Sequence, residues 1–146
     1  MSPVSFSHEP VLLDEVVDGL VGDSGGLYVD ATLGLGGHSE AILNRLHGGR
    51  LLGIDLDPEA LSEAGKRLKG GTERFRAIGG NFRTLGQILQ KEQFFPLSGV
   101  LFDLGVSSLH FDKASRGFSF SKEGPLDMRL SPENPLTAEA IVNRWP

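Results

Sequence analysis

The sequence contains no cysteine among its 146 residues. Disulfides, zinc sites built on thiolates and cysteine nucleophiles are therefore excluded. Its histidines, His38 and His110 included, show no metal-binding spacing, so we expect no metal. No apolar run reaches the length of a membrane span. No lysine or arginine precedes Arg45, so the N-terminus has neither secretory-signal nor transit-peptide character. These absences favour a cytoplasmic protein with no membrane contact.

An excess of positive charge is also missing. The formal net charge is −5, so the chain as a whole does not attract nucleic acid. A local basic patch counts for more than this sum, however. Between Lys66 and Arg83 only Glu73 is acidic among several basic residues. A solvated helix face explains such a stretch, and phosphate contact is the alternative.

Apolar runs alternate with segments of helical spacing. With 39% hydrophobic and 23% charged residues, the composition is that of one globular domain. We predict strands over 27–32, 50–55, 74–80 and 97–105, and helices from Pro10, over 37–46, 57–70 and 82–91, and from about Leu136. Asp57 suits the N-cap of its helix, with Pro58 at the first position. This alternation predicts a parallel α/β sheet, half of a doubly wound fold, with the fourth strand at an unpaired edge.

The glycine turn after the first predicted strand indicates a ligand. Gly34, Gly36 and Gly37 would bring bare backbone N–H groups up to it, and the alternative is a tight turn with no ligand. A dinucleotide fingerprint needs a third glycine where Ser39 stands. The observed Asp30-x-x-x-Gly34-x-Gly36 resembles motif I of S-adenosylmethionine-dependent methyltransferases. An acid is tolerated there, near the amino-acid part of the cofactor.

Other candidate residues follow the remaining strands. Asp55 ends the second strand, where a carboxylate can accept both ribose hydroxyls of an adenosine, in NAD and S-adenosylmethionine alike. Phe82 could lie against an adenine face or belong to the core. Asp103 closes the fourth strand, where amino-group methyltransferases hold the amine. Leu104-Gly105 replaces the prolines of their D/N-P-P-Y motif, so a carboxylate that only orders the loop is the alternative.

A long loop without clear period covers residues 107–134. Loops of this length are more often functional than idle. Its RGFSF stretch, with Arg116, Phe118 and Phe120, mixes a cation with aromatic rings, as single-stranded RNA grooves do. A loop that packs its own hydrophobic floor fits these residues equally well.

Six motifs together resemble one family. The chain contains, in this order, HEPVLLDEV, YVDATLGLGGHS, GIDLDPEAL, GNFRTL, LFDLGVSS and RGFSFSKEGPLDMRL. In these motifs and their order it resembles the bacterial small-subunit rRNA (cytosine-N4)-methyltransferases, RsmH or MraW. The resemblance extends from His8 to about Arg144. It implies a Rossmann-like class I methyltransferase fold. It also implies methyl transfer from S-adenosylmethionine to N4 of a cytidine, with small-subunit rRNA or the ribosomal subunit as partner.

The resemblance also implies site residues. The family's cofactor contacts match Gly36, Gly37, His38, Asp55, Phe82, Asp103 and His110. Asp103 is in addition the expected catalytic residue. Positions near the family's cytidine entrance match Arg116, Phe118, Asp127 and Arg129.

Family members are longer and insert a helical domain after the fourth strand before the sheet is completed. We therefore expect residues 1–134 to form the N-terminal part of an incomplete methyltransferase domain, with its first four parallel strands. Residues 135–146 would begin a truncated helical insertion. A non-catalytic cofactor-binding remnant and an NAD-binding oxidoreductase remain as alternatives, and a homodimer stays open.

Overall fold

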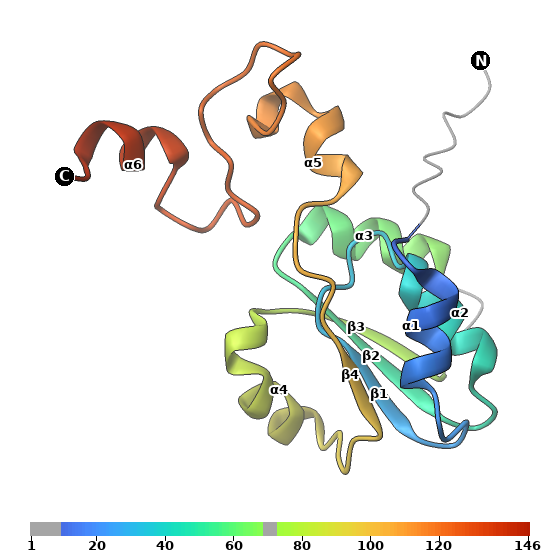
Figure 1. The fold of residues 1–146 in the computed structure, drawn as a ribbon. Coiled ribbons are helices and arrows are strands. Elements are labelled where there is room, and N and C mark those ends of the chain that lie inside the picture. The colour runs from blue at the N-terminus through green and yellow to red at the C-terminus, as the bar shows by residue number, and fades with distance from the viewer. Residues whose placement is uncertain (1–9, 69–72) are drawn as a thin grey trace.

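The structure is a computed structural model that describes residues 10–68 and 73–146. Its elements in chain order are α1 (Leu13–Leu20), β1 (Leu27–Asp30), α2 (Gly37–Arg45), β2 (Arg50–Asp55), α3 (Pro58–Arg67), β3 (Phe75–Gly79), the 3₁₀ turn η2 (Phe82–Thr84), α4 (Leu85–Glu92), β4 (Gly99–Leu101), α5 (Ser108–Asp112), the 3₁₀ turn η3 (Ala114–Arg116) and α6 (Ala138–Arg144). Figure 1 shows the sheet beside its helices, with α6 standing apart.

The four strands form one parallel sheet in the order β3-β2-β1-β4. From β1 the chain adds β2 and β3 on one side, then returns to place β4 on the other side of β1. The strand order therefore reverses between β1 and β4. In open α/β sheets such a switch point leaves a crevice outside the carboxyl ends of the strands, where ligands bind. The predicted parallel sheet is confirmed, and among the strands that the structure describes β4 pairs only with β1.

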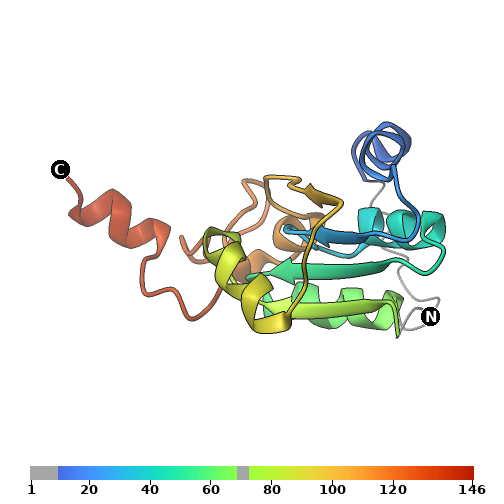
Figure 2. The ribbon, with the colours of Figure 1, turned by 90° about the horizontal axis from the view of Figure 1, so that it is seen from below.

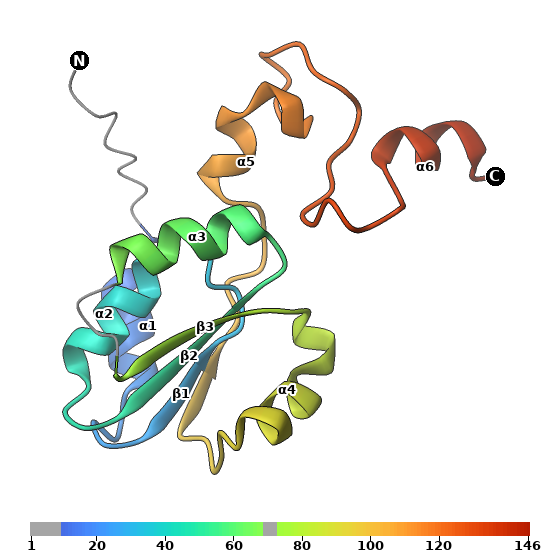
Figure 3. The same ribbon diagram turned by 180° about the vertical axis from the view of Figure 1, so that it is seen from behind.

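Each face of the sheet has its own hydrophobic cluster. Tyr28 and Leu51 pack with α1, α2 and α3 on one face, whereas their neighbours Val29 and Leu52 join a second cluster under α4. Successive strand residues point to opposite faces, so a strand buried on both sides is apolar throughout. Figures 2 and 3 show the same layers from below and from behind.

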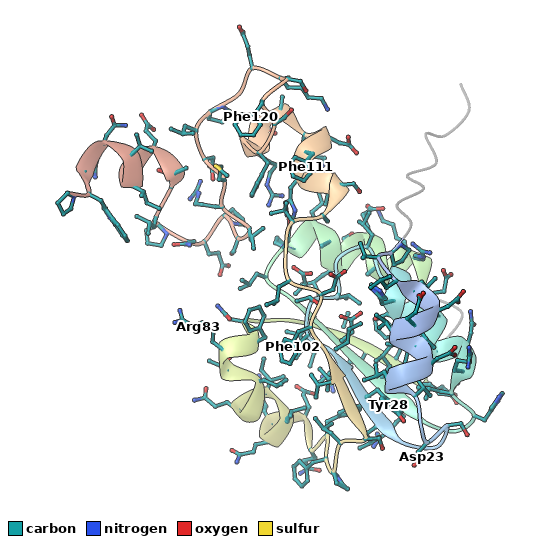
Figure 4. The ribbon with its side chains drawn as sticks, viewed as in Figure 1. Asp23, Tyr28, Arg83, Phe102, Phe111 and Phe120 are labelled. Atoms are coloured by element: carbon teal, nitrogen blue, oxygen red, sulfur yellow. The ribbon has the colours of Figure 1, made fainter. Side chains whose placement is uncertain are left out.

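Local signals explain several element boundaries. Asp57 caps α3, since its side chain accepts a hydrogen bond from the Glu59 N–H at 2.9 Å, and Pro58 follows it. Tyr28 fixes the loop before β1, because its hydroxyl donates to the Asp23 carbonyl at 2.8 Å (Figure 4). Strand β2 coincides with the predicted 50–55, and the Asp57 cap is confirmed.

The first helix begins later than predicted. It starts at Leu13 rather than Pro10, because Leu12 has φ 51° and the chain turns there. Two tertiary contacts hold the preceding residues instead. Pro10 packs against Gly37, and the Val11 carbonyl accepts a hydrogen bond from the His38 ring. The helical spacing from Pro10 was correct only for its later part.

The other differences have similar causes. The fourth strand ends at Leu101 because its partner β1 stops at Asp30, so the predicted 102–105 has no strand to pair with. The helix predicted from Phe82 opens as a 3₁₀ turn capped by Asn81 and continues as α4. The last helix starts at Ala138, with Thr137 as its N-cap. Among the described residues, no helix has the length and apolarity needed to cross a bilayer.

Candidate functional site

A cavity of about 520 Å³ lies at the carboxyl ends of β1, β2 and β4. Four segments of its walls follow the strands: Ala31–Leu35 after β1, Asp55 and Leu56 after β2, Gly80 and Phe82 after β3, and Asp103–Ser107 with His110 after β4. The remaining lining residues are Pro10, Val11, Gly37, Ala60, Arg67 and Leu130. It therefore occupies the switch point that the strand order predicts. Cavities of roughly 300–1,000 Å³ are typical of small-molecule and cofactor sites.

The glycine turn serves packing as well as the cavity. Gly36 has φ 79°, and a Cβ added there would lie 3.1 Å from the side chain of Leu68, the C-cap of α3. Its N–H donates to the Leu33 carbonyl and its own carbonyl accepts from the Glu40 N–H. Gly34 and Gly37 do line the cavity, whereas Gly36 does not. The close approach at Gly36 thus comes from α3, and its cofactor contact remains a prediction.

Asp30 faces away from the cavity and holds α2 to the end of β1. The Ser39 hydroxyl donates to its Oδ2 at 2.7 Å, and the Thr32 N–H donates to Oδ1 at 3.2 Å. The carboxyl is buried, and removal from water raises its pKa above the usual range, with the two hydrogen bonds opposing that rise. Asp30 is therefore an internal support of the glycine turn.

The Asp55 carboxylate is held by two backbone groups and lines the cavity. The Gly34 N–H donates to Oδ2 at 2.7 Å and the Asp57 N–H donates to Oδ1 at 2.9 Å. A carboxylate offers about four acceptor sites, so two stay available on the cavity side. This arrangement suits a pair of neighbouring hydroxyls, as the sequence predicts for ribose.

His38 and Asp103 present two acceptors to each other. The His38 Nε2 lies 3.0 Å from the Val11 carbonyl, which can only accept, so Nε2 carries a hydrogen, and in the neutral ring Nδ1 then has the lone pair. This Nδ1 lies 3.6 Å from the Asp103 Oδ2. The Asp103 N–H donates to the Thr32 hydroxyl at 2.7 Å, which fixes the start of the loop. A ligand donor beside the pair would satisfy both acceptors.

An aromatic pair forms the wall after β3. Phe82 lines the cavity and meets Phe102 edge to face, with ring centroids 5.7 Å apart. Figure 4 shows Phe102 beyond the end of β4, with Arg83 pointing outward from η2, just before α4. The exposed face of Phe82 is apolar and can support a flat heterocycle. The adenine contact remains a prediction that this position supports.

The structure brings His110 into a buried ionic cluster that the sequence did not indicate. His110 Nε2 lies 2.9 Å from the Asp57 Oδ2, and the Arg116 Nη2 lies 2.8 Å from the same oxygen. His110 lines the cavity, and its ring packs against Phe118 at 5.0 Å between centroids. Sequence reasoning assigned Asp57 only to a helix cap. No local pattern joins residues 53 positions apart, so nothing in the sequence could reveal this contact.

The residues predicted at the cytidine entrance lie mostly against one another. Arg129 donates two hydrogen bonds to Asp127 at 2.8 Å and two more to backbone carbonyls of its own loop. The hydrogen bonds from Arg129 lower the pKa of Asp127 to about 2. Phe118 is buried. A smaller cavity of about 250 Å³ has Arg116, Asp127 and Arg129 in its walls, apart from the first. Their contact with substrate remains a prediction.

Across residues 10–68 and 73–146, no three His, Asp or Glu side chains cluster as metal ligands would. The comparison with known families decides the class of protein. The sequence matches the MraW methylase family over residues 5–146.

The chain belongs to the MraW methylase family. It is 49% identical over 143 residues to the ribosomal RNA small subunit methyltransferase H of Dehalococcoides mccartyi, a match that covers 97% of this chain and 41% of that protein. The protein of the same name from Carboxydothermus hydrogenoformans is 48% identical over 143 residues, with 98% and 46% covered. This MraW-family chain thus spans less than half the length of both relatives.

A solved structure supports the fold of this MraW-family chain. An rRNA methylase from Streptococcus thermophilus superposes with a TM-score of 0.51 at 24% identity, over 64% of this chain and 52% of that one. At this identity the likeness shows the fold alone, which is the Rossmann-like class I fold of S-adenosylmethionine-dependent methyltransferases. The predicted family and fold class are confirmed, and the NAD-dependent oxidoreductase alternative has no support.

Proposed function

We propose that this chain provides the cofactor site of an enzyme that methylates small-subunit rRNA, with S-adenosylmethionine as methyl donor and N4 of a cytidine as acceptor. One observation carries the proposal. Loops from four strand ends meet around a single cavity at the switch point, and Asp55, Phe82 and Asp103 all line it. Family membership supplies the reaction class.

The cavity fits an adenosine-containing cofactor by its chemistry. Asp55 offers acceptors for the ribose hydroxyls, and Phe82 offers an apolar wall for the adenine. The Asp103 carboxylate, with the His38 Nδ1 beside it, offers acceptors for the amino group of the methionine part. Bound S-adenosylmethionine supplies a methyl group on a sulfonium, an excellent leaving group.

Asp103 is the residue best placed to act on the acceptor. The N4 lone pair of cytosine is delocalised into the ring, so that nitrogen is a weak nucleophile. The enzyme must hold it in line with the S–CH₃ bond and accept a proton as the new bond forms. The Asp103 carboxylate is about half exposed, lies at the cavity wall, and is anchored through its own backbone to Thr32. The target base would have to leave its stack to reach it.

A second candidate is cofactor binding without turnover by these residues alone. One observation favours it. Arg116 and Arg129, predicted to face the substrate, are both engaged in ion pairs, Arg116 with Asp57 at the start of α3 and Arg129 with Asp127 of its own loop. Four expectations stay predictions. Residues 1–134 would form part of the catalytic domain, and residues 135–146 would begin a helical insertion. The cytoplasmic location and the homodimer are the other two. The position of α6 away from the sheet is consistent with the separate helical unit (Figures 1 and 2).

A methyl-transfer assay separates the two candidates. The chain is incubated with S-adenosylmethionine and small-subunit particles that lack the modification, and N4-methylcytidine is measured by mass spectrometry. Formation of N4-methylcytidine supports the first proposal, and cofactor binding without it supports the second. Methylation at another atom would contradict the cytosine N4 assignment.

Substitution of Asp103 tests the mechanism in this chain or in any longer form that carries it. Asp103→Asn keeps the size of the side chain but removes the proton acceptor. We expect turnover to fall about 100-fold or more, the typical contribution of a positioned base. Circular dichroism should not change, since the side chain is about half exposed and its contact with His38 is 3.6 Å long. Undiminished turnover would reject the role.

A further inference from the structure

Asp57 stands at the centre of contacts that join two distant parts of the chain. Its side chain is 1% exposed. Oδ1 accepts from the Glu59 N–H at 2.9 Å, as a helix cap requires. Oδ2 faces away from the helix and contacts both His110 and Arg116, at 2.9 and 2.8 Å. A cap needs only the first of these contacts, so the second oxygen serves another purpose.

The hydrogen bonds of His110 define its tautomer. The Ser107 N–H lies 3.0 Å from the His110 Nδ1, and a backbone N–H can only donate. Nδ1 therefore carries the lone pair, Nε2 carries the hydrogen, and the Nε2–H group donates to Asp57. The Ser107 N–H and Asp57 thus act together: one occupies the lone pair on Nδ1, and the other accepts from Nε2–H and fixes the orientation of the ring.

This chain of contacts reaches the wall of the large cavity. Ser107 and His110 both line it, together with Asp103 and the exposed Leu104 between them. The segment from Leu104 to Val106 belongs to no strand or helix. Its far end is held where Ser107 bonds to His110, and His110 in turn bonds to Asp57. Without Asp57 the loop would keep its anchor at Asp103, through the Thr32 hydroxyl, and beyond α5 the more exposed pairs of Lys113 and Arg116 with Glu59.

We propose that Asp57 is the positioning residue of the cofactor site. Acting through His110 and Arg116, it holds the Asp103–His110 loop in the form that closes the large cavity. Arg116 acts together with His110, since it neutralises the buried Asp57 carboxylate and links η3 to α3. The inference rests on the proposed function, because the cavity it shapes is the one that function assigns to the cofactor.

The test compares two aspartate variants of the 146-residue chain. In Asp57→Asn the amide oxygen can still accept from the Glu59 N–H and cap α3. The amide NH₂ then takes the place of Oδ2 and faces the His110 Nε2–H and the Arg116 guanidinium, which are both donors. Asp112→Asn is the control, since the side chain of this exposed last residue of α5 has one charged neighbour, Lys122, at 4.0 Å. S-adenosylhomocysteine binding is measured by calorimetry, and the His110 tautomer by long-range ¹H–¹⁵N spectra of the free chain.

We expect Asp57→Asn to weaken S-adenosylhomocysteine binding about tenfold or more, the effect of losing one charged hydrogen bond. The His110 ring should lose its single Nε2–H tautomer, which a cap-only role for Asp57 would leave in place. The control should match the unaltered chain in both readouts. Unchanged affinity with an unchanged tautomer in Asp57→Asn overturns the proposal.

A second variant decides the matter if Asp57→Asn does not fold. Arg116→Gln removes the ionic contact from the loop side and leaves the α3 cap intact. It should weaken binding severalfold and disturb the His110 signals, and no effect on either would overturn the inference. Failure of the unaltered chain to bind S-adenosylhomocysteine counts against the proposed function instead. The tautomer readout needs no ligand, so it still decides whether Asp57 positions His110.

Discussion

At the scale of single residues, the two aspartates at the ends of β1 and β2 have opposite roles. Asp30 is turned inward and supports the glycine turn, whereas Asp55 is turned toward the cavity with acceptors available. Asp55→Ala should reduce affinity for S-adenosylhomocysteine roughly tenfold to 100-fold, since a hydrogen bond to a charged group contributes about 1.5–3 kcal/mol. Calorimetry measures this, and an affinity unchanged from that of the native chain would exclude the ribose role.

Asp30 provides a pH test of its own. Its pKa is raised in the folded chain, mainly by burial, so the folded state holds this proton more tightly than the unfolded state does. The free energy of unfolding should therefore fall as pH rises from the unfolded pKa of 3.8 toward the raised folded value. Asp30→Asn has no such proton, so its stability relative to the native chain should rise over that range. Urea unfolding at several pH values checks the sign; a constant difference would contradict it.

At the scale of elements, the close approach of α3 to the glycine turn requires a residue without a side chain at position 36. An alanine there must adopt φ 79° and bring its Cβ within 3.3 Å of both Leu68 and Ala64. We expect Gly36→Ala to destabilise the chain by about 1–3 kcal/mol. Gly65→Ala within α3 is the control, because a Cβ there has no neighbour within 4 Å, and alanine should stabilise that helix by up to about 1 kcal/mol. Equal effects of the two substitutions in thermal unfolding would refute the packing argument.

The loop between α5 and α6 has a different dependence on pH. Arg129 lowers the pKa of Asp127 to about 2, against 3.8 in the unfolded chain. Its contribution to stability is thus complete above about pH 4 and is lost as pH falls toward 2. Carbon-13 NMR of the Asp127 carboxyl should show a midpoint near 2. In Arg129→Gln the midpoint should move back toward the ordinary value, and no movement would show that another group causes the shift.

The elements also show how far sequence reasoning reaches. Strand β2 was predicted to the residue, because a fully buried strand is a continuous apolar run and Asp55 ends it. The start of α1 was missed, since Pro10 and Val11 are held by Gly37 and His38, which local spacing does not register. Within the site, Asp55, Phe82 and Asp103 could be predicted from their places at strand ends. The Asp57–His110–Arg116 cluster could not, because it depends on a loop folding back onto a helix.

At the scale of the whole molecule, the strand order explains why chemically different residues meet. Asp55, Phe82 and Asp103 lie far apart in the sequence, yet β1 stands between β2 and β4 and brings their ends together. Within residues 10–68 and 73–146, one helix, α4, packs on one face of the sheet, whereas α1, α2 and α3 pack on the other. The rRNA-binding part of the proposed function depends on the segment after β4, where Asp127 pairs with Arg129, and Arg116 pairs with Asp57 at the start of α3.

The central claim is that the cofactor binds at the carboxyl ends of β1, β2 and β4. The most direct test is titration of the ¹⁵N-labelled chain with S-adenosylhomocysteine, followed by ¹H–¹⁵N correlation spectra. The account predicts saturable shifts concentrated in residues 31–37, around Asp55 and Phe82, and over 103–110. An absence of shifts, or shifts confined to residues distant from this cavity, would contradict it.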